Sequence, residues 1–333
     1  MDIISIQQQL FQVIKSKLAV DSSVADEVAS LLDISTDSAY RRMRGEKVVT
    51  FDELYKLSLH YRISLDQLMN INTGSFMFQG NLLNRDSFRF DAYFKNMLQT
   101  ISYFNSFKQK EYYYLCKDVP IFYHFLSSEI AAFKYFFWMK SIFDFPEYAN
   151  KKFSFDLYPE ELAITGEKIL DTYNQIPSVE FWNVENINIA IRQIEFYRDS
   201  HIFQSDQDAL KIYEAWEKVI DHVERQAQKG YKYKYGDKET KPLGEYKVYF
   251  NEVILGDNSM LVILDGVKIA VVMHTVINYL QTRDVTFCEN IYNYMQNLAR
   301  RSTLISEVSE KERSKFFRIL RERIQVRKEA LRL

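Results

Sequence analysis

The residues between Ser35 and Lys47 carry the side chains in this sequence that are best suited to a chemical role. The run STDSAYRRMRGEK begins with short polar side chains and continues with four basic residues and one acid between positions 41 and 47. Arginine and lysine neutralise phosphate groups, and arginine can also form two hydrogen bonds with a guanine edge. This combination indicates contact with nucleic acid.

Two short helices joined by a tight turn are expected to present this run. The first is predicted from about Ser22 to Leu32, and a serine at its start can cap the free N–H groups of the first turn. A turn over 33–35 follows, and the second helix should run from Thr36 to about Arg44 and end at Gly45. Two helices in this order form a helix-turn-helix, whose second helix enters the major groove of DNA.

The second helix is expected to turn Ala39 and Met43 inward and its polar side chains outward. Its arginines at 41 and 44, together with the lysine at 47, should neutralise phosphates, and residues 36, 37, 38 and 42 should face base edges. The serine at 35 either caps the helix or donates to a phosphate. The predicted DNA-binding residues are Ser35, Thr36, Asp37, Ser38, Tyr40, Arg41, Arg42, Arg44 and Lys47.

Further helices are expected around this pair. One contains Ile4, Leu10 and Ile14 at helical spacing, and another begins at Thr50, where Thr50 and Glu53 form a capping box. The run SLDQLM over 64–69 repeats this capping pattern.

Residues 25–69 resemble the Cro/repressor (XRE) class of bacterial helix-turn-helix domains, and most closely its BetR-like branch. The resemblance lies in VASLLDIS, in the pattern S-x-x-x-Y-R-R-x-R-G-E-K, and in FDELYKLSLHY followed by ISLDQLM. It implies sequence-specific binding to double-stranded DNA and transcriptional regulation, commonly as a homodimer. The sequence departs from the common pattern at Ala25, at Asp33 in place of a turn glycine, and at Arg42, which takes an often buried position. We therefore expect Met43 or Tyr40 to fill that core position.

Composition limits the fold class and the kinds of site that the rest of the chain can form. The chain has 333 residues, a net charge of −2, nine glycines and five prolines, which favours helices over a sandwich with many turns. Two distant cysteines and five scattered histidines form no metal-binding motif, so no metal and no cofactor are expected. The cysteine content suits a reducing cytoplasm, although a single disulfide between them stays possible. Charged residues interrupt the most apolar stretch, so no membrane-spanning segment is expected.

The remainder of the chain reads as an aromatic-rich body. Helices are predicted over 91–107, 122–143, 158–228 and 284–332, with a buried strand at 111–116. Strands joined by hairpins at 256–258 and 265–266 predict a small antiparallel sheet over 245–275. The expected fold is mainly α with a small antiparallel β-sheet: a helix-turn-helix domain over 1–73, a linker over 74–90 and a large α+β domain over 91–333.

Two segments of this body allow more than one interpretation. The aromatic runs between 86 and 158 either fill a core, which we favour, or line an apolar ligand pocket. The basic segment from Arg300 to Leu333 carries an apolar stripe that packs on the core, docks on a second copy, or adds affinity for DNA or a membrane surface.

The sequence thus predicts a cytoplasmic, non-enzymatic transcriptional regulator, commonly a homodimer, whose C-terminal body serves for dimerisation or for sensing a small-molecule or peptide effector. The alternatives are a protein- or peptide-binding module and an enzyme whose active site lies in the C-terminal body. No 34-residue repeat supports the first, and no recognisable catalytic motif supports the second.

Overall fold

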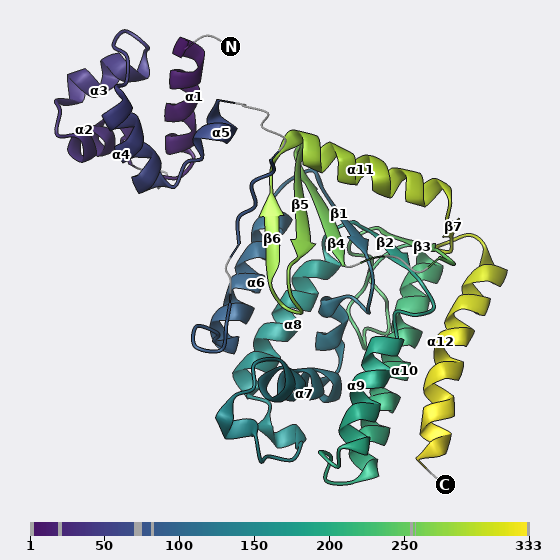
Figure 1. Ribbon diagram of the computed structural model, residues 1–333. Coiled ribbons are helices and arrows are strands. Elements are labelled where there is room, and N and C mark those ends of the chain that lie inside the picture. Colours follow the sequence, from purple (N-terminus) through teal and green to yellow (C-terminus); the bar gives the residue numbers. More distant parts are fainter. Residues whose placement is uncertain are drawn as a thin grey trace. The chain divides into compact units, whose positions relative to one another are not determined.

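The computed structural model describes residues 3–18, 22–69, 75–80, 83–253, 256 and 258–331. The chain divides into two compact units, Met1–Met77 and Phe78–Leu333 (Figure 1). Each unit has a hydrophobic core of its own. The start of the expected linker, at residue 74, lies outside the described residues.

The described part of the first unit contains five helices around a small apolar core. They are α1 (Ile3–Lys15), α2 (Val24–Leu32), α3 (Thr36–Met43), α4 (Phe51–Tyr61) and α5 (Leu65–Leu68). The predicted helices are present, and the caps of two of them are confirmed: Ser23 caps α2, and Thr50 and Glu53 form the capping box of α4. Local capping signals were therefore sufficient to place the starts of α2 and α4.

A seven-stranded mixed sheet organises the second unit, in the order β6-β5-β4-β1-β2-β3-β7. The pairs β1–β2 and β2–β3 are parallel, and the other neighbouring strands are antiparallel. The strands are β1 (Lys110–Leu115), β2 (Ser178–Trp182), β3 (Tyr246–Phe250), β4 (Ser259–Leu264), β5 (Val267–Met273), β6 (Tyr279–Thr282) and β7 (Thr303–Leu304).

Helices cover both faces of this sheet (Figure 1). Alternate residues of β1 show the division, because Tyr113 and Leu115 pack in the core under α11, whereas Tyr112 and Tyr114 join the larger core on the other face. The helices are α6 (Phe90–Asn105), α7 (Ser128–Phe137), α8 (Glu160–Asn174), α9 (Asn188–Asp199), α10 (Asp206–Lys229), α11 (Val285–Arg300) and α12 (Glu310–Ala330). None of the helices in the described part of the chain is both long and apolar enough to cross a bilayer.

The expectation of a small antiparallel sheet is wrong. The sheet is larger, its centre is parallel, and it includes β1 and a strand, β2, that was read as part of a helical region. All five residues of β2 are buried, so the strand shows none of the alternation by which a half-exposed strand is found. A parallel pair needs a long crossover, and helices α7 to α10 supply the two crossovers here.

One of the two expected hairpins is present. Strands β4 and β5 pair around Asp265 and Gly266, both of which have positive φ, as a tight hairpin turn requires. The other expected hairpin, at 256–258, would have paired β3 with β4, but β3 pairs with β2 and β7 instead. Of the residues in that turn, Asp257 lies outside the described part.

The segment before α6 is attached to the second unit. The backbone of Gln79 pairs with Gln281 in β6, and both Phe88 and Phe90 are buried in the larger core. Part of the expected linker over 74–90 therefore contributes to this unit.

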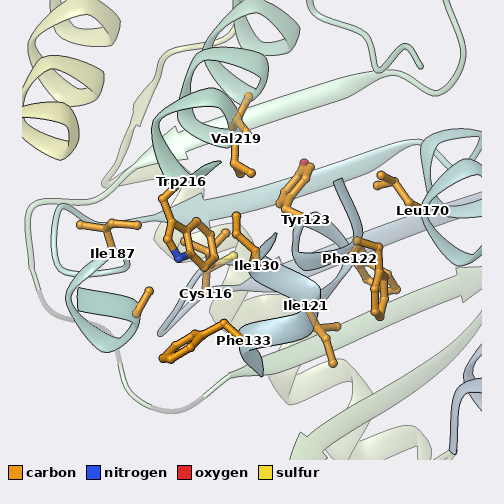
Figure 2. Packing of buried hydrophobic residues seen from close by; sticks show 14 of the residues in the cluster. Cys116, Ile121, Phe122, Tyr123, Ile130, Phe133, Leu170, Ile187, Trp216 and Val219 are labelled. Carbon is orange, nitrogen blue, oxygen red and sulfur yellow. The ribbon is translucent and has the colours of Figure 1, made fainter. Parts of the chain in front are cut away.

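The aromatic runs fill the core of the second unit, as we expected (Figure 2). Phe133 and Phe136 are completely buried on α7, and Tyr123 and Trp216 pack nearby from η1 (Ile121–Leu126) and α10. Rings meet mainly edge to face, the arrangement that the charge distribution of aromatic rings favours.

Helix α12 packs on the core through Phe317, Leu320 and Ile324, so the core-facing interpretation of the basic C-terminal segment is confirmed. Several of its basic side chains form ion pairs with acids of the same unit. Arg321 pairs with Asp221 and Glu224, and the other pairs are Arg323–Glu185, Arg327–Glu195 and Lys328–Glu217.

A completely buried carboxyl group, that of Glu180, lies on β2 at the middle of the sheet. One oxygen accepts hydrogen bonds from the hydroxyls of Tyr123, at 3.0 Å, and Tyr173. The other accepts from the indole N–H of Trp182 at 2.7 Å and from the hydroxyl of Tyr246 at 2.8 Å. Four donors from η1, α8, β2 and β3 therefore converge on one side chain.

We expect Glu180→Gln to lower the free energy of unfolding by about 2–4 kcal/mol, because the amide N–H₂ would replace one carboxyl oxygen and face the donors that this oxygen now accepts from. Urea unfolding followed by tryptophan fluorescence measures this change. The matched control is Glu167→Gln on the exposed face of α8, which should change the free energy by less than about 0.5 kcal/mol. Equal effects of the two substitutions would contradict the role of the buried group.

Candidate nucleic-acid interface

The turn between α2 and α3 has the geometry of a helix-turn-helix. Asp33 ends α2 in the left-handed conformation, with φ 54° and ψ 51°, and its N–H donates to the carbonyl of Ala29. The N–H of Ile34 donates to the same carbonyl at 3.0 Å. An aspartate tolerates this conformation better than most residues, so Asp33 takes the place of the turn glycine without opening the turn.

Ser35 caps α3. Its side-chain oxygen accepts from the N–H of Ser38 at 3.2 Å, which supports the capping role among the two proposed for this residue. Thr36 is tied to the preceding helix, because its hydroxyl donates to Asp26 at 3.2 Å. Residues 35 to 37 are nevertheless exposed at the N-terminal end of α3.

The exposed residues of α3 and its C-cap form one continuous surface. At 100° per residue, positions 36, 40, 44, 37 and 41 fall in this order within an arc of about 140°. All five are exposed, whereas Ala39 on the opposite side is completely buried and Met43 is partly buried. We call this surface the α3 arc; its residues are Thr36, Asp37, Tyr40, Arg41 and Arg44.

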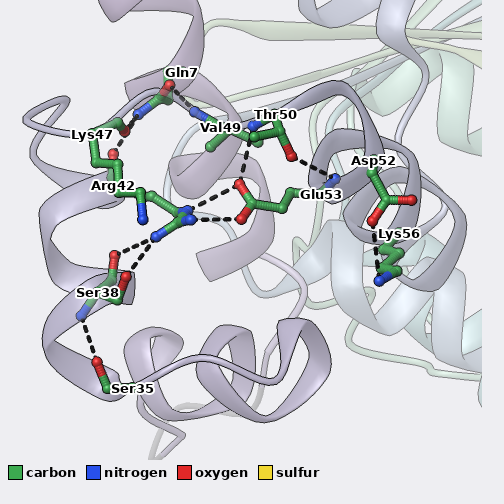
Figure 3. A network of polar contacts seen from close by, with 10 residues as sticks. All are labelled: Gln7, Ser35, Ser38, Arg42, Lys47, Val49, Thr50, Asp52, Glu53 and Lys56. Atoms are coloured by element: carbon green, nitrogen blue, oxygen red, sulfur yellow. Dashed lines mark hydrogen bonds and ion pairs between the residues drawn. The ribbon is translucent and has the colours of Figure 1, made fainter.

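Arg42 does not belong to this surface, so the expectation that it faces base edges is wrong. Its side chain is only 3% exposed and lies inside the unit (Figure 3). The guanidinium makes two hydrogen bonds to Glu53, at 2.9 and 2.5 Å, and two more to the backbone and hydroxyl oxygens of Ser38, at 3.0 and 2.7 Å. Arg42 therefore fills the position that we assigned to Met43 or Tyr40, and Tyr40 is exposed.

This pair ties α3 to α4. Glu53 also accepts from the N–H of Thr50 at 3.0 Å, so one carboxylate completes the cap of α4 and fixes the guanidinium of Arg42. The hydrogen bonds from Arg42 hold the pKa of Glu53 below its ordinary value. Ser38, another predicted DNA contact, is partly buried, and its hydroxyl oxygen accepts a hydrogen bond from Arg42.

The loop after α3 is held by Gln7 of α1, a residue that no sequence motif singled out (Figure 3). Its amide nitrogen donates to the carbonyls of Arg42, at 2.7 Å, and Lys47, at 2.8 Å, and its oxygen accepts from the N–H of Val49 at 2.9 Å. Gly45 turns this loop with φ +79°, and a Cβ there would lie 2.7 Å from Ile4. The loop that carries Lys47 is therefore fixed at three points.

Charge on this surface is balanced by Glu46. Arg44 donates to Glu46 at 2.7 and 3.1 Å, and Arg41 lies 3.9 Å away from the same carboxylate. The hydrogen bond with Arg44 lowers the pKa of Glu46 and raises that of Arg44. All three groups are exposed, so a phosphate can displace the carboxylate from the arginines.

Other candidates for chemistry lie in the core of the second unit. Cys116 and Cys288 are buried, unpaired thiols, and burial raises the pKa of both. Burial also lowers the pKa of His222 to about 4, and it takes that of His124 well below its ordinary value. Within the described ranges, no group of three or more histidine, cysteine, aspartate or glutamate side chains is arranged to hold a metal ion.

Comparison of the chain with models of protein families, with curated proteins and with solved structures finds no match.

We expect Arg42→Ala and Glu53→Ala each to destabilise the first unit by about 2–3 kcal/mol, because each leaves one member of a largely buried ion pair without its partner. The double variant should lose about 1–3 kcal/mol less than the sum of the single variants. Hydrogen exchange of α1 to α4, measured by mass spectrometry on the full chain, reports this local stability. Arg41→Ala is the control, and a comparable loss of protection in this exposed variant would contradict the assignment.

Proposed function

We propose that this chain is a bacterial, cytoplasmic, non-enzymatic transcriptional regulator that binds double-stranded DNA through its first unit. The observation that carries the proposal is the α3 arc, which presents two arginines beside short polar side chains on a helix following a tight turn. This is the arrangement by which a recognition helix reads the major groove. The first unit also keeps the sequence features that resemble the Cro/repressor (XRE) class.

In this proposal α3 enters the major groove with its N-terminal end towards the bases. Thr36 and Asp37 lie at this end and face base edges, whereas Arg41, Arg44 and Lys47 contact phosphates. Arg42 acts from inside the unit, because it holds α3 against α4 and so fixes the direction of the α3 arc.

DNA selected from a random-sequence library by the full chain provides the test of this proposal. Fluorescence anisotropy should show salt-sensitive binding, and Arg41→Ala/Arg44→Ala should reduce affinity and lower the slope of log K against log salt by about 2 for each bound module, since each module loses two phosphate contacts. Glu46→Gln should act in the opposite direction and tighten binding, because it removes the acid that competes with phosphate.

The matched control for this experiment is Lys15→Ala/Lys17→Ala, which removes the same charge from the exposed end of α1. This variant should keep the specific affinity of the unaltered chain. Failure to select any sequence, or an equal loss in the two double variants, would refute DNA binding through the α3 arc.

A second copy of the chain is the partner we propose for the exposed face of α4. Phe51, Tyr55 and Leu59 lie four residues apart on this helix and are 82%, 59% and 66% exposed. Large apolar side chains in such a row indicate an interaction surface. Asp52 and Lys56 flank the row and pair with each other at 3.1 Å. Two antiparallel copies of α4 could exchange these partners across a two-fold axis, as a symmetric dimer requires.

We expect Leu59→Asp to convert the dimer to a monomer, because a carboxylate would be buried in the apolar contact. Light scattering coupled to size-exclusion chromatography measures the mass at a fixed concentration. Val326→Asp, which alters an exposed apolar residue of α12, should leave the dimer intact. Dissociation by Val326→Asp alone would place the contact on α12 and contradict this assignment.

A further inference from the structure

The second unit contains a cavity of about 300 Å³ between α6, the sheet and the segment before α6. Its lining residues on α6 run from Arg89, the N-cap, to Phe104 in the last turn. At 1.5 Å per residue, these two positions are about 22 Å apart along the helix axis. A volume near 300 Å³ lies at the lower end of the range for small-molecule sites, so a cavity of this length is narrow.

Two rows of residues from α6 border this cavity, and the rows differ in character. The inner row is buried or half-buried and consists of Tyr93, Met97, Ile101 and Phe104. The outer row is exposed and consists of Arg89, Ala92, Asn96 and Thr100. Spacings of three and four residues place the members of each row one above the other along the helix. The cavity is therefore apolar on its inner side and mainly polar along its exposed edge.

The tyrosines of the inner wall present their rings to the cavity and keep their hydroxyls for the protein. The hydroxyl of Tyr93 is inaccessible, so only the ring of this residue borders the cavity. Tyr112 donates its hydroxyl to the sulfur of Met260 at 2.9 Å, and the side chain of Tyr279 is hydrogen-bonded to that of Tyr114. These lining groups therefore favour an apolar occupant, because a polar group placed against them would lose its contacts with water.

The other polar lining groups are paired or lie at the exposed edge. Asn278 is buried, and its amide is hydrogen-bonded to both backbone groups of Leu83, at 3.3 and 3.2 Å. The exposed polar lining residues are Gln79, Ser87, Arg89, Asn96, Thr100 and Gln281. Among the described lining residues, Arg89 is the one cation and none is an acid. The ion pair of Arg89 with Asp91, at 3.7 Å, is exposed and weak, so another carboxylate can replace Asp91.

We propose that this cavity binds a straight-chain carboxylic acid of medium length, with its hydrocarbon chain along the inner row of α6 and its carboxylate beside Arg89. The narrow apolar interior takes the chain, because each buried methylene group removes apolar surface from water. The carboxylate stays at the exposed edge, where water solvates it and the guanidinium can donate two parallel hydrogen bonds.

The cavity also includes the residues with which the chain enters the second unit. Gln79 and Gly80 line it, and the backbone of Gln79 pairs with Gln281 at 2.7 and 2.8 Å. Gly80 lies so close to β6 that a Cβ there would be 2.6 Å from Leu280. A bound acid would therefore contact the segment that begins directly after Met77, where the first unit ends. Its role as an effector of DNA binding rests on the function proposed above.

The dependence of affinity on chain length tests the placement of the hydrocarbon. Hexanoate, octanoate and decanoate, each below its critical micelle concentration, are titrated into the full chain by isothermal titration calorimetry. Binding should saturate at one molecule per chain, and the affinity should rise about fourfold for each added methylene group that is buried.

Substitution of Arg89 tests the placement of the carboxylate. Arg89→Gln should weaken the binding of octanoate by about threefold, as expected for an exposed ion pair, and should leave the binding of uncharged octan-1-ol unchanged. Lys95→Gln is the matched control, because Lys95 lies on the same helix and pairs with the same Asp91, at 3.5 Å, but is not a lining residue. This control should bind octanoate as the unaltered chain does.

Filling the cavity supplies a third readout. Val271→Trp should abolish the binding of octanoate, because the indole would occupy the apolar interior. Thr100→Trp alters only the exposed row, which keeps the core intact, and should weaken binding by covering the edge of the cavity. Tyr103→Trp, at an exposed position of α6 outside the lining, is the control and should leave the affinity unchanged.

Absence of saturable binding, or an affinity that does not rise from hexanoate to decanoate, would overturn the proposal. Unchanged binding in both cavity-filling variants would also overturn it. Equal losses in Arg89→Gln and Lys95→Gln, or an equal loss for octanoate and octan-1-ol in Arg89→Gln, would refute the placement of the carboxylate. These measurements use no DNA, so their failure is distinct from a failure of the DNA-binding proposal.

Discussion

The buried carboxyl group of Glu180 is the interaction on which the second unit depends. In β2 it lies opposite Tyr114 of β1 and Val248 of β3, on the face that is covered by α6 to α10 and α12. A shift of β2 by one residue would turn Glu180 to the face under α11, where the core is apolar and supplies no such set of donors. A carboxyl group without donors in a core costs several kcal/mol, so this single residue specifies the register of the parallel centre of the sheet. Lys232, which is also buried, reinforces this arrangement, because its Nζ donates to the carbonyl of Tyr173 at 2.8 Å and lies 3.7 Å from the centre of the ring whose hydroxyl bonds Glu180.

The environment of Glu180 shows why sequence patterns predicted the helices better than the sheet. Helix ends are encoded locally, by groups such as Ser23, Thr50 and Glu53, whose partners lie within a few residues. Strand β2 carries an acid among apolar residues, is buried on both faces and pairs with strands far away in the sequence. Strand β3 was recognised from the sequence, but its neighbours in the sheet, β2 and β7, were not. The sequence after β3 contains turn residues, but the order of strands is decided by helical crossovers and by buried groups such as Glu180, which no local pattern reveals.

Within the first unit, the prediction was wrong for one arginine, Arg42, which is buried. The helical period correctly places Ala39 inside and Arg41 and Arg44 outside. The same period places position 42 opposite the α3 arc, on the side of Ala39, but the charge of an arginine favours solvent. The structure buries Arg42 because Glu53, selected from the sequence only as a capping residue, lies within reach of its guanidinium. Gln7 was missed for a similar reason, since its three hydrogen bonds connect positions that are at least 35 residues apart in the sequence. Residues that hold a binding surface in place can thus resemble the residues that form it.

The separation of the cores limits how an effector could control DNA binding under our two proposals. The geometry of the α3 arc is fixed inside the first unit by Arg42, Glu53 and Gln7, and all of their hydrogen-bond partners lie in that unit. An effector that binds in the second unit can act on the segment at Gln79 and Gly80, which is paired with β6 and is continuous with the first unit along the chain. Regulation would then change the spacing of two DNA-binding modules in a dimer, and the surface that each module presents to DNA would stay the same.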